Sequence, residues 1–102
     1  MYRHELRFVL RFGGSGEFQE LAAELSEEET ARGWTPPGVW HAVSGRVNEV
    51  VIEHDYDSPE TFRRERNEFH AEPGRVGDVL ARIAELAVPG TAAQLELDGH
   101  PG

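Results

Sequence analysis

The first segment of the chain constrains the fold more than any other feature of the sequence. Its even positions carry mainly apolar side chains: Tyr2, His4, Leu6, Phe8, Leu10 and Phe12. Its odd positions carry mainly charged ones: Arg3, Glu5, Arg7, Val9 and Arg11. A period of two over this length predicts a β-strand that turns one face to a core and exposes a charged face.

The rest of the chain alternates between helical and extended patterns. The apolar stripe of Phe18, Leu21, Ala22 and Leu25 predicts a helix whose Ser26–Glu29 side faces water. Ser58-Pro59 is typical of a helix start, and Pro73-Gly74 interrupts the helix that follows. The expected elements are strand 2–12, helix 16–32, strands 39–43 and 48–56, helices 58–72 and 75–87, and strand 91–97.

The order of these elements is β-α-β-β-α-β. It predicts an α+β, ferredoxin-like fold with an antiparallel sheet, as one domain over residues 1–98 followed by a flexible tail at 99–102. A hairpin turn at Gly45-Arg46 would place Trp40 opposite Val51. In this topology helices cover one face of the sheet. We expect a second copy of the chain to cover the other and form a dimeric α/β barrel.

The charge and composition exclude several classes of partner and chemistry. Nineteen acidic against ten basic residues give a net charge of −9, which disfavours nucleic acid and anionic membranes as partners. All the basic residues are Arg, so lysine chemistry is excluded, and without Cys neither disulfides nor thiolate sites can form. No apolar run approaches a membrane span or a signal peptide, so a cytoplasmic location is expected.

The sheet face that the helices leave bare carries the candidate site. Strand alternation assigns to it Arg7, Val9, Arg11, Trp40, Glu49, Val51, Glu53, Asp55, Gln94 and Glu96. This face is either a polar pocket inside a barrel or a set of ion pairs at a dimer interface. Burying such charges costs several kcal/mol each unless they are well paired. The interface interpretation therefore requires that the charges pair with one another, whereas the pocket interpretation leaves some of them to contact a ligand.

The pocket interpretation gives these residues distinct roles. Glu53 would act as a general base and Arg7 would hold a substrate oxygen in a bidentate manner. Trp40 would stack on an aromatic ring, and Arg11, Glu49 and Val51 would complete the substrate-binding surface. If an Arg pairs with Glu53 instead, that carboxylate becomes an anchor.

No motif indicates a metal or a cofactor. The five His residues show no His-x-His or His-x-x-x-His spacing, and His4, His41 and His54 are expected on the helix-facing side or at strand edges. The glycine cluster at residues 13–16 lacks the Lys of a phosphate loop and the spacing of a dinucleotide-binding turn. We therefore expect neither a metal site nor a cofactor.

Several short segments, in order and spacing, resemble NIPSNAP-type domains. They are His4-Glu5-Leu6-Arg7, Glu17-Phe18-Gln19-Glu20-Leu21, Gly38-Val39-Trp40, the run from Gly45 to Val51, Tyr56-Asp57-Ser58, and Arg63-Arg64. The resemblance spans about residues 4–70 and implies a bacterial protein with a ferredoxin-like chain in a dimeric α/β barrel. The wider group includes cofactor-independent monooxygenases, cyclases, isomerases and ligand-sensing domains, so the fold alone leaves the function open.

Two functions therefore follow from the sequence. The first is an enzyme without cofactor, of cyclase, isomerase or monooxygenase type, acting on a small hydrophobic or aromatic molecule in secondary or catabolic metabolism. The second is a non-catalytic homodimer of NIPSNAP type that binds a ligand or a protein.

Overall fold

A four-stranded antiparallel sheet forms one layer of the fold, with strand order β2-β3-β1-β4. The computed structural model describes residues 1–99, and within them the strands are β1 (Tyr2–Val9), β2 (Gly38–His41), β3 (Glu49–Tyr56) and β4 (Ala93–Asp98). β1 lies in the centre and pairs with both β3 and β4. Its strict alternation therefore sets the two faces of the sheet.

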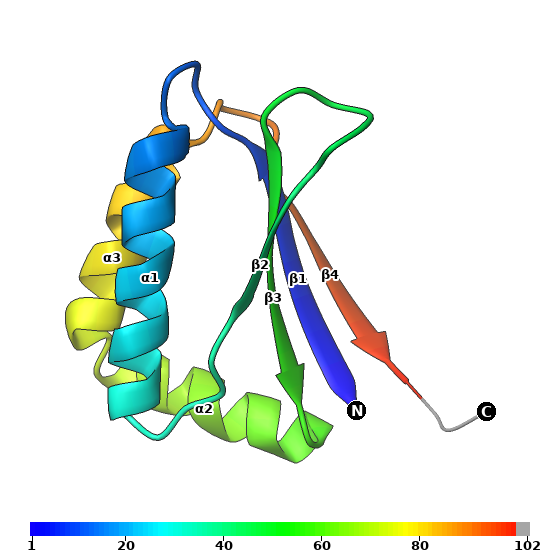
Figure 1. Ribbon diagram of the computed structural model, residues 1–102. Coiled ribbons are helices and arrows are strands. Elements are labelled where there is room, and N and C mark those ends of the chain that lie inside the picture. Colours follow the sequence, from blue (N-terminus) through cyan, green and yellow to red (C-terminus); the bar gives the residue numbers. More distant parts are fainter. Residues whose placement is uncertain (100–102) are drawn as a thin grey trace.

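Helices cover only one of those faces (Figure 1). The helices are α1 (Ser15–Ala31), α2 (Pro59–Ala71) and α3 (Gly74–Leu86). α1 and α3 run side by side along the sheet, while α2 crosses the end of the layer near the N-terminus. This arrangement confirms the predicted ferredoxin-like α+β fold. No helix within residues 1–99 is both long and apolar enough to cross a membrane.

The core lies between the sheet and the antiparallel helices α1 and α3. Phe8 and Leu10 come from the apolar side of the first segment, and Val50 and Ile52 from β3. The helices contribute Phe18, Leu21, Ala22, Leu25, Val76, Val79 and Ile83, and Trp34 closes one end. Apolar side chains at period two therefore meet apolar side chains at period 3.6, as predicted.

The hairpin between β2 and β3 has the predicted register but a wider turn. Trp40 lies opposite Val51, and the Ala42 N–H donates to the Glu49 carbonyl at 3.0 Å. Regular pairing ends there, because Gly45 and Asn48 adopt left-handed conformations with φ of +88° and +62°. The loop therefore occupies residues 43–48 instead of two residues, and the faces of both strands are unchanged.

The corner between α2 and α3 is tightly packed. Gly74 has a positive φ of +53°, which turns the chain after Pro73. A Cβ added at Gly77 would lie 2.6 Å from the Cβ of Pro73, closer than two carbon atoms can approach. Glycine at position 77 thus leaves room for the Pro73 side chain to pack against the first turn of α3.

The largest difference from the expected element boundaries is at the end of β1. β1 ends at Val9, three residues early, because Leu10 bridges to Ala87 and the Arg11 N–H donates to the Leu86 carbonyl. At the other terminus the Gly99 N–H donates to the Met1 carbonyl at 2.8 Å. The remainder of the predicted flexible tail lies outside the described residues.

The start of α2 provides a test of local stability. The Ser58 side chain accepts from the Thr61 N–H at 3.2 Å and Pro59 occupies the first helical position. We expect Ser58→Ala to lower the free energy of unfolding by about 1 kcal/mol, or about 4 to 8 °C in melting temperature. Ser44→Ala, in the exposed β2–β3 loop, is the matched control and should melt like the parent. Equal melting temperatures for the two variants would contradict a capping role for Ser58.

Candidate functional site

A cavity of about 410 Å³ lies between the helix-facing side of the sheet and α2. Its size falls in the range of small-molecule sites, roughly 300–1,000 Å³. The strands contribute His4, Leu6, Ile52, His54, Tyr56, Gln94 and Glu96. The helices and the segment after α1 contribute Glu29, Trp34, Phe62, Glu65, Arg66, Phe69, His70, Val76 and Leu80. Aromatic walls with a few polar groups are typical of a ligand site.

A histidine–carboxylate pair forms one wall. His54 Nε2 lies 2.9 Å from Glu29 Oε1 and 3.1 Å from Oε2, and both side chains are nearly buried. With Glu29 ionised, Nε2 carries the hydrogen and donates it to the carboxylate. In the neutral imidazole this leaves the lone pair on Nδ1, which is the arrangement of a histidine oriented to accept a proton.

Tyr56 lies beside this pair, and its hydroxyl is unpartnered. Its ring stacks on His54 at 5.8 Å between centroids and meets Phe62 edge-on at 5.2 Å. Tyr56 is 8% exposed, and within residues 1–99 no hydrogen bond reaches its hydroxyl. No fully buried polar side-chain atom of these residues lacks a partner, so this hydroxyl is accessible, on a residue that lines the cavity.

Burial, together with the nearby carboxylates of Glu29 and Glu65, raises the pKa of Tyr56 well above its usual value. Removal from water disfavours the charged phenolate, and negative neighbours disfavour it further. Tyr56 therefore keeps its proton at neutral pH and can donate a hydrogen bond to a ligand.

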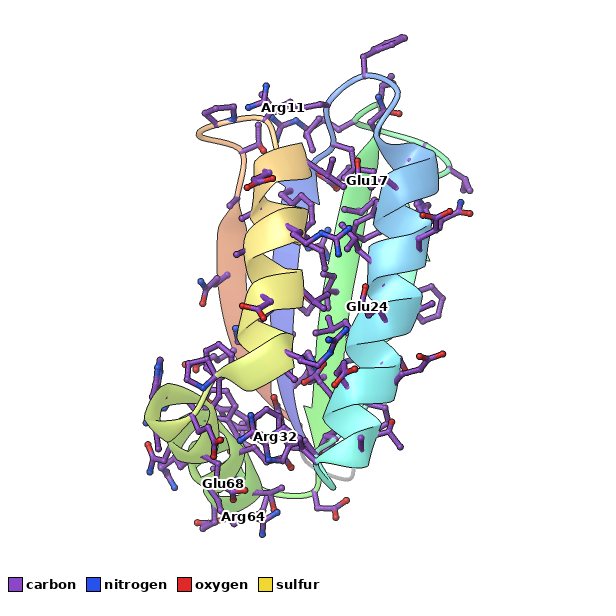
Figure 2. The ribbon with its side chains drawn as sticks, turned by 90° about the vertical axis from the view of Figure 1, so that its left-hand side faces the viewer. Arg11, Glu17, Glu24, Arg32, Arg64 and Glu68 are labelled. Atoms are coloured by element: carbon purple, nitrogen blue, oxygen red, sulfur yellow. The ribbon has the colours of Figure 1, made fainter. Side chains whose placement is uncertain are left out.

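Glu65 is a second buried carboxylate, and it holds α2 against the segment that follows α1. The Thr35 N–H donates to Oε1 at 2.7 Å and the Thr35 hydroxyl donates to Oε2 at 2.9 Å. One turn further along α2, Glu68 accepts from Trp34 Nε1 at 3.1 Å. Figure 2 shows Glu68 and Arg64 on α2, with Arg32 between α2 and the end of α1. These polar contacts fix α2 over the cavity.

Less buried groups surround these residues. His4 lies 3.3 Å from the Gln94 side-chain oxygen and stacks on Phe62, while Arg66 and His70 are exposed on α2. Although three histidines line one cavity, no group of three or more His, Asp or Glu side chains within residues 1–99 is arranged to hold a metal ion.

The sequence predicted a site on the opposite side of the sheet, and most of those residues do lie there. Arg7, Trp40, Glu49, Val51 and Glu53 share the uncovered face, as the register shows. A Cβ at Gly38 would lie 3.3 Å from Glu53 Oε1 and 3.5 Å from Trp40 Nε1, so both of these side chains fold over Gly38. Their placement was predictable because alternate side chains of a strand always point to the same face of the sheet.

The charges on this face are paired. Arg3 donates to both carboxylate oxygens of Asp55, at 2.7 and 3.1 Å, and lies 3.7 Å from Glu53. Arg7 lies 3.7 Å from Glu5 and 3.8 Å from Glu49. The bond from Arg3 lowers the pKa of Asp55. In the single chain, the face is thus a row of ion pairs flanked by Trp40, Leu95 and Leu97.

Three residues do not lie where the sequence placed them. Arg11 is beyond β1, and its Nε donates to the Glu85 carbonyl near the end of α3. Figure 2 shows Arg11 at this end of the molecule. Gln94 and Glu96 face the helices, since they pair with Leu6 and His4, while Leu95 and Leu97 point to the uncovered face. The face assignment for β4 was therefore wrong. Its polar residues lie on the helix-facing side but line the cavity, so they are not packed in the hydrophobic core.

Sequence reasoning also missed the two buried carboxylates that line the cavity. Glu29 was expected on the water-facing side of its helix but is 8% exposed, and Glu65 is 6% exposed. Spacing is the signal that could have found them. Glu29 follows Leu25 by four residues, and Glu65 lies between Phe62 and Phe69 on one helical face. A carboxylate on an apolar stripe is costly, which makes it a candidate functional residue.

The sequence matches no known protein-family model, and no curated protein matches it significantly. Solved structures do match. An uncharacterised NIPSNAP domain protein from Burkholderia xenovorans is 19% identical with a TM-score of 0.76, over 98% of this chain and 95% of that one. A NIPSNAP family protein from Agrobacterium tumefaciens is 19% identical with a TM-score of 0.73, over 97% and 92%.

A second group of structures has the same architecture. A protein described as an antibiotic biosynthesis monooxygenase is 10% identical with a TM-score of 0.73, over 99% of this chain and all of that one. The chain therefore has the ferredoxin-like fold of NIPSNAP domain proteins and of antibiotic biosynthesis monooxygenases. The NIPSNAP resemblance that the sequence indicated is confirmed at the level of the fold.

The Tyr56 environment predicts a pH effect. The pKa of Tyr56 is raised in the folded chain from the ordinary value of 10.0. The contribution of this group to the free energy of unfolding is therefore fully present below about pH 10 and decreases as the pH rises further. Spectrophotometric titration should show Tyr56 ionising above pH 10, with Tyr56→Phe identifying the signal against that of Tyr2. The variant's stability should also depend less on alkaline pH. Ionisation of Tyr56 at the ordinary value would contradict its enclosure.

Proposed function

We propose that the protein binds a small aromatic or apolar molecule in the cavity beneath α2 and moves a proton on it without a cofactor. The observation that supports this proposal best is the Glu29–His54 pair on the cavity wall. A carboxylate that fixes the tautomer of a histidine on the wall of a cavity is a recurrent arrangement for general base catalysis.

The chemistry follows from the geometry. His54 Nδ1 would take a proton from a carbon next to a carbonyl group, or from a phenol, and the electron pair would remain on the substrate as an enolate or phenolate. The Tyr56 O–H would donate to the substrate oxygen as charge develops there. The resulting imidazolium would be stabilised by Glu29, and it could return the proton at another position. Such an activated substrate is common to cyclase, isomerase and monooxygenase reactions.

The cavity side of the sheet fits this role better than the uncovered face. Glu53, the base that the sequence predicted, is 3.7 Å from Arg3, and Arg7 is half exposed on an open sheet. A role for Glu53 as base and Arg7 as anion holder requires a second sheet to enclose them.

We also propose that the uncovered face pairs with a second copy of the chain. Trp40, Leu95 and Leu97 are 60%, 48% and 42% exposed on that face, and large apolar side chains left in water favour an interaction surface. A partner protein of another kind on this face would instead favour the non-catalytic alternative.

Proton transfer can be tested with phenylacetone, an aromatic ketone with an enolisable methylene group. In deuterium oxide, we expect the protein to accelerate exchange of the methylene protons, followed by NMR. His54→Gln should slow that exchange by on the order of 10²-fold, the usual contribution of a general base. Glu29→Gln should slow it less. His41→Gln is the matched control, because His41 packs on Phe18 away from the cavity. Exchange that is indifferent to His54 would remove it as the base.

Self-association is tested by sedimentation equilibrium. We expect Leu95→Glu to shift the protein toward monomer, because it adds a buried negative charge next to Glu5 in the paired faces. Phe12→Glu is the control, since Phe12 is 97% exposed in the loop after β1. A parent protein that sediments as a monomer at all accessible concentrations would contradict the pairing.

A further inference from the structure

Negative charge is the unusual property of the cavity. Its lining contains three carboxylates, those of Glu29, Glu65 and Glu96, against the single guanidinium of Arg66. His54 partners Glu29, but both oxygens of Glu65 accept from uncharged groups of Thr35. The nearest guanidinium nitrogen to Glu65 belongs to the exposed Arg64, at 3.8 Å. The buried charge of Glu65 is therefore only weakly compensated.

The walls around these carboxylates are aromatic. Trp34, Tyr56, Phe62 and Phe69 line the same cavity. Two of these rings already attract cations: the Arg32 guanidinium lies 3.9 Å from the centroid of Trp34 and that of Arg66 lies 5.4 Å from Phe62. Aromatic faces combined with carboxylates are the surroundings in which proteins bind organic cations.

An independent observation points to a ligand at this place. The Tyr56 hydroxyl is in a residue that is more than nine-tenths buried and lines the cavity, and it has no protein partner within residues 1–99. Because this hydroxyl is accessible and has no partner among residues 1–99, a ligand in the cavity can hydrogen-bond to it. As an acceptor, this hydroxyl suits an ammonium N–H.

We infer that the ligand of this cavity carries an amine, held as an ammonium group among Glu65, Tyr56 and the aromatic walls. The inference rests on the proposed function for the location of the ligand, and it narrows the ligand class. Carboxylate ligands are disfavoured, since they would meet three like charges. The net charge of −9 also concentrates cations around the protein.

Three probes with one aromatic body test this inference by titration calorimetry at neutral pH: phenethylammonium, phenethyl alcohol and phenylacetate. We expect phenethylammonium to bind at least about tenfold more tightly than the alcohol, and phenylacetate more weakly than either. The preference for the cation should decrease as salt is added. An alcohol or a carboxylate that binds as tightly as the amine overturns the inference.

Variants then identify the residues responsible. Glu65→Gln should abolish most of the preference for the amine while keeping the affinity for the alcohol, which shows that the cavity is intact. Glu68→Gln is the matched control on the same helix: Glu68 does not line the cavity, and an amide oxygen can still accept from Trp34. Tyr56→Phe, which keeps the ring, should weaken amine binding more than alcohol binding. Amine preference that survives in both Glu65→Gln and Tyr56→Phe overturns the assignment.

The result is separable from the proton-transfer proposal. Phenethylammonium and its analogues have no carbonyl group, so their binding does not depend on His54 chemistry. Exchange of phenylacetone protons without amine preference would contradict only the present inference, and amine preference without exchange would contradict only the catalytic role of His54.

Discussion

The packing of one side of β1 against α1 and α3 is the contact on which the other features depend. Phe8 and Leu10 anchor the central strand to the helices, and pairing with β3 and β4 extends the same face across the sheet. Because successive side chains point to opposite faces, burying this side leaves Arg3, Glu5 and Arg7 on the other. The packing of one side of β1 against the helices thus defines both faces of the sheet. One is covered and borders the cavity, and the other is uncovered and carries the ion pairs.

Much of this arrangement was predictable from the sequence. The alternation of β1, the register of the β2–β3 hairpin and the Ser58-Pro59 helix start come from local signals, and each is found in the structure, although the hairpin turn is wider than predicted. Glu53 and Trp40 were correctly placed on one face for the same reason. The face of β4 was not predictable in this way, because its polar residues border a cavity instead of solvent.

The cavity itself could not be predicted, since it arises from the tertiary position of α2. The α2–α3 corner directs α2 across the end of the sheet, and the Glu65–Thr35 and Glu68–Trp34 bonds hold it there. Those contacts join residues about thirty positions apart in the sequence. Helix and strand periodicity describes only neighbouring residues, so it cannot predict such contacts. His54 was correctly expected on the helix side, but its partner Glu29 comes from a different element, so their pairing becomes visible only in the fold.

The close contact at Gly77 gives this fold a simple means of varying its specificity. One added methyl group there would press on Pro73 at the junction with α2, and α2 forms one side of the cavity. Neither Gly77 nor Pro73 lines the cavity, so the chemical groups offered to a ligand would stay the same while the space between them changed. In this chain, the size of the molecule that fits is thus tied to a junction outside the cavity, separately from the side chains that would react with it.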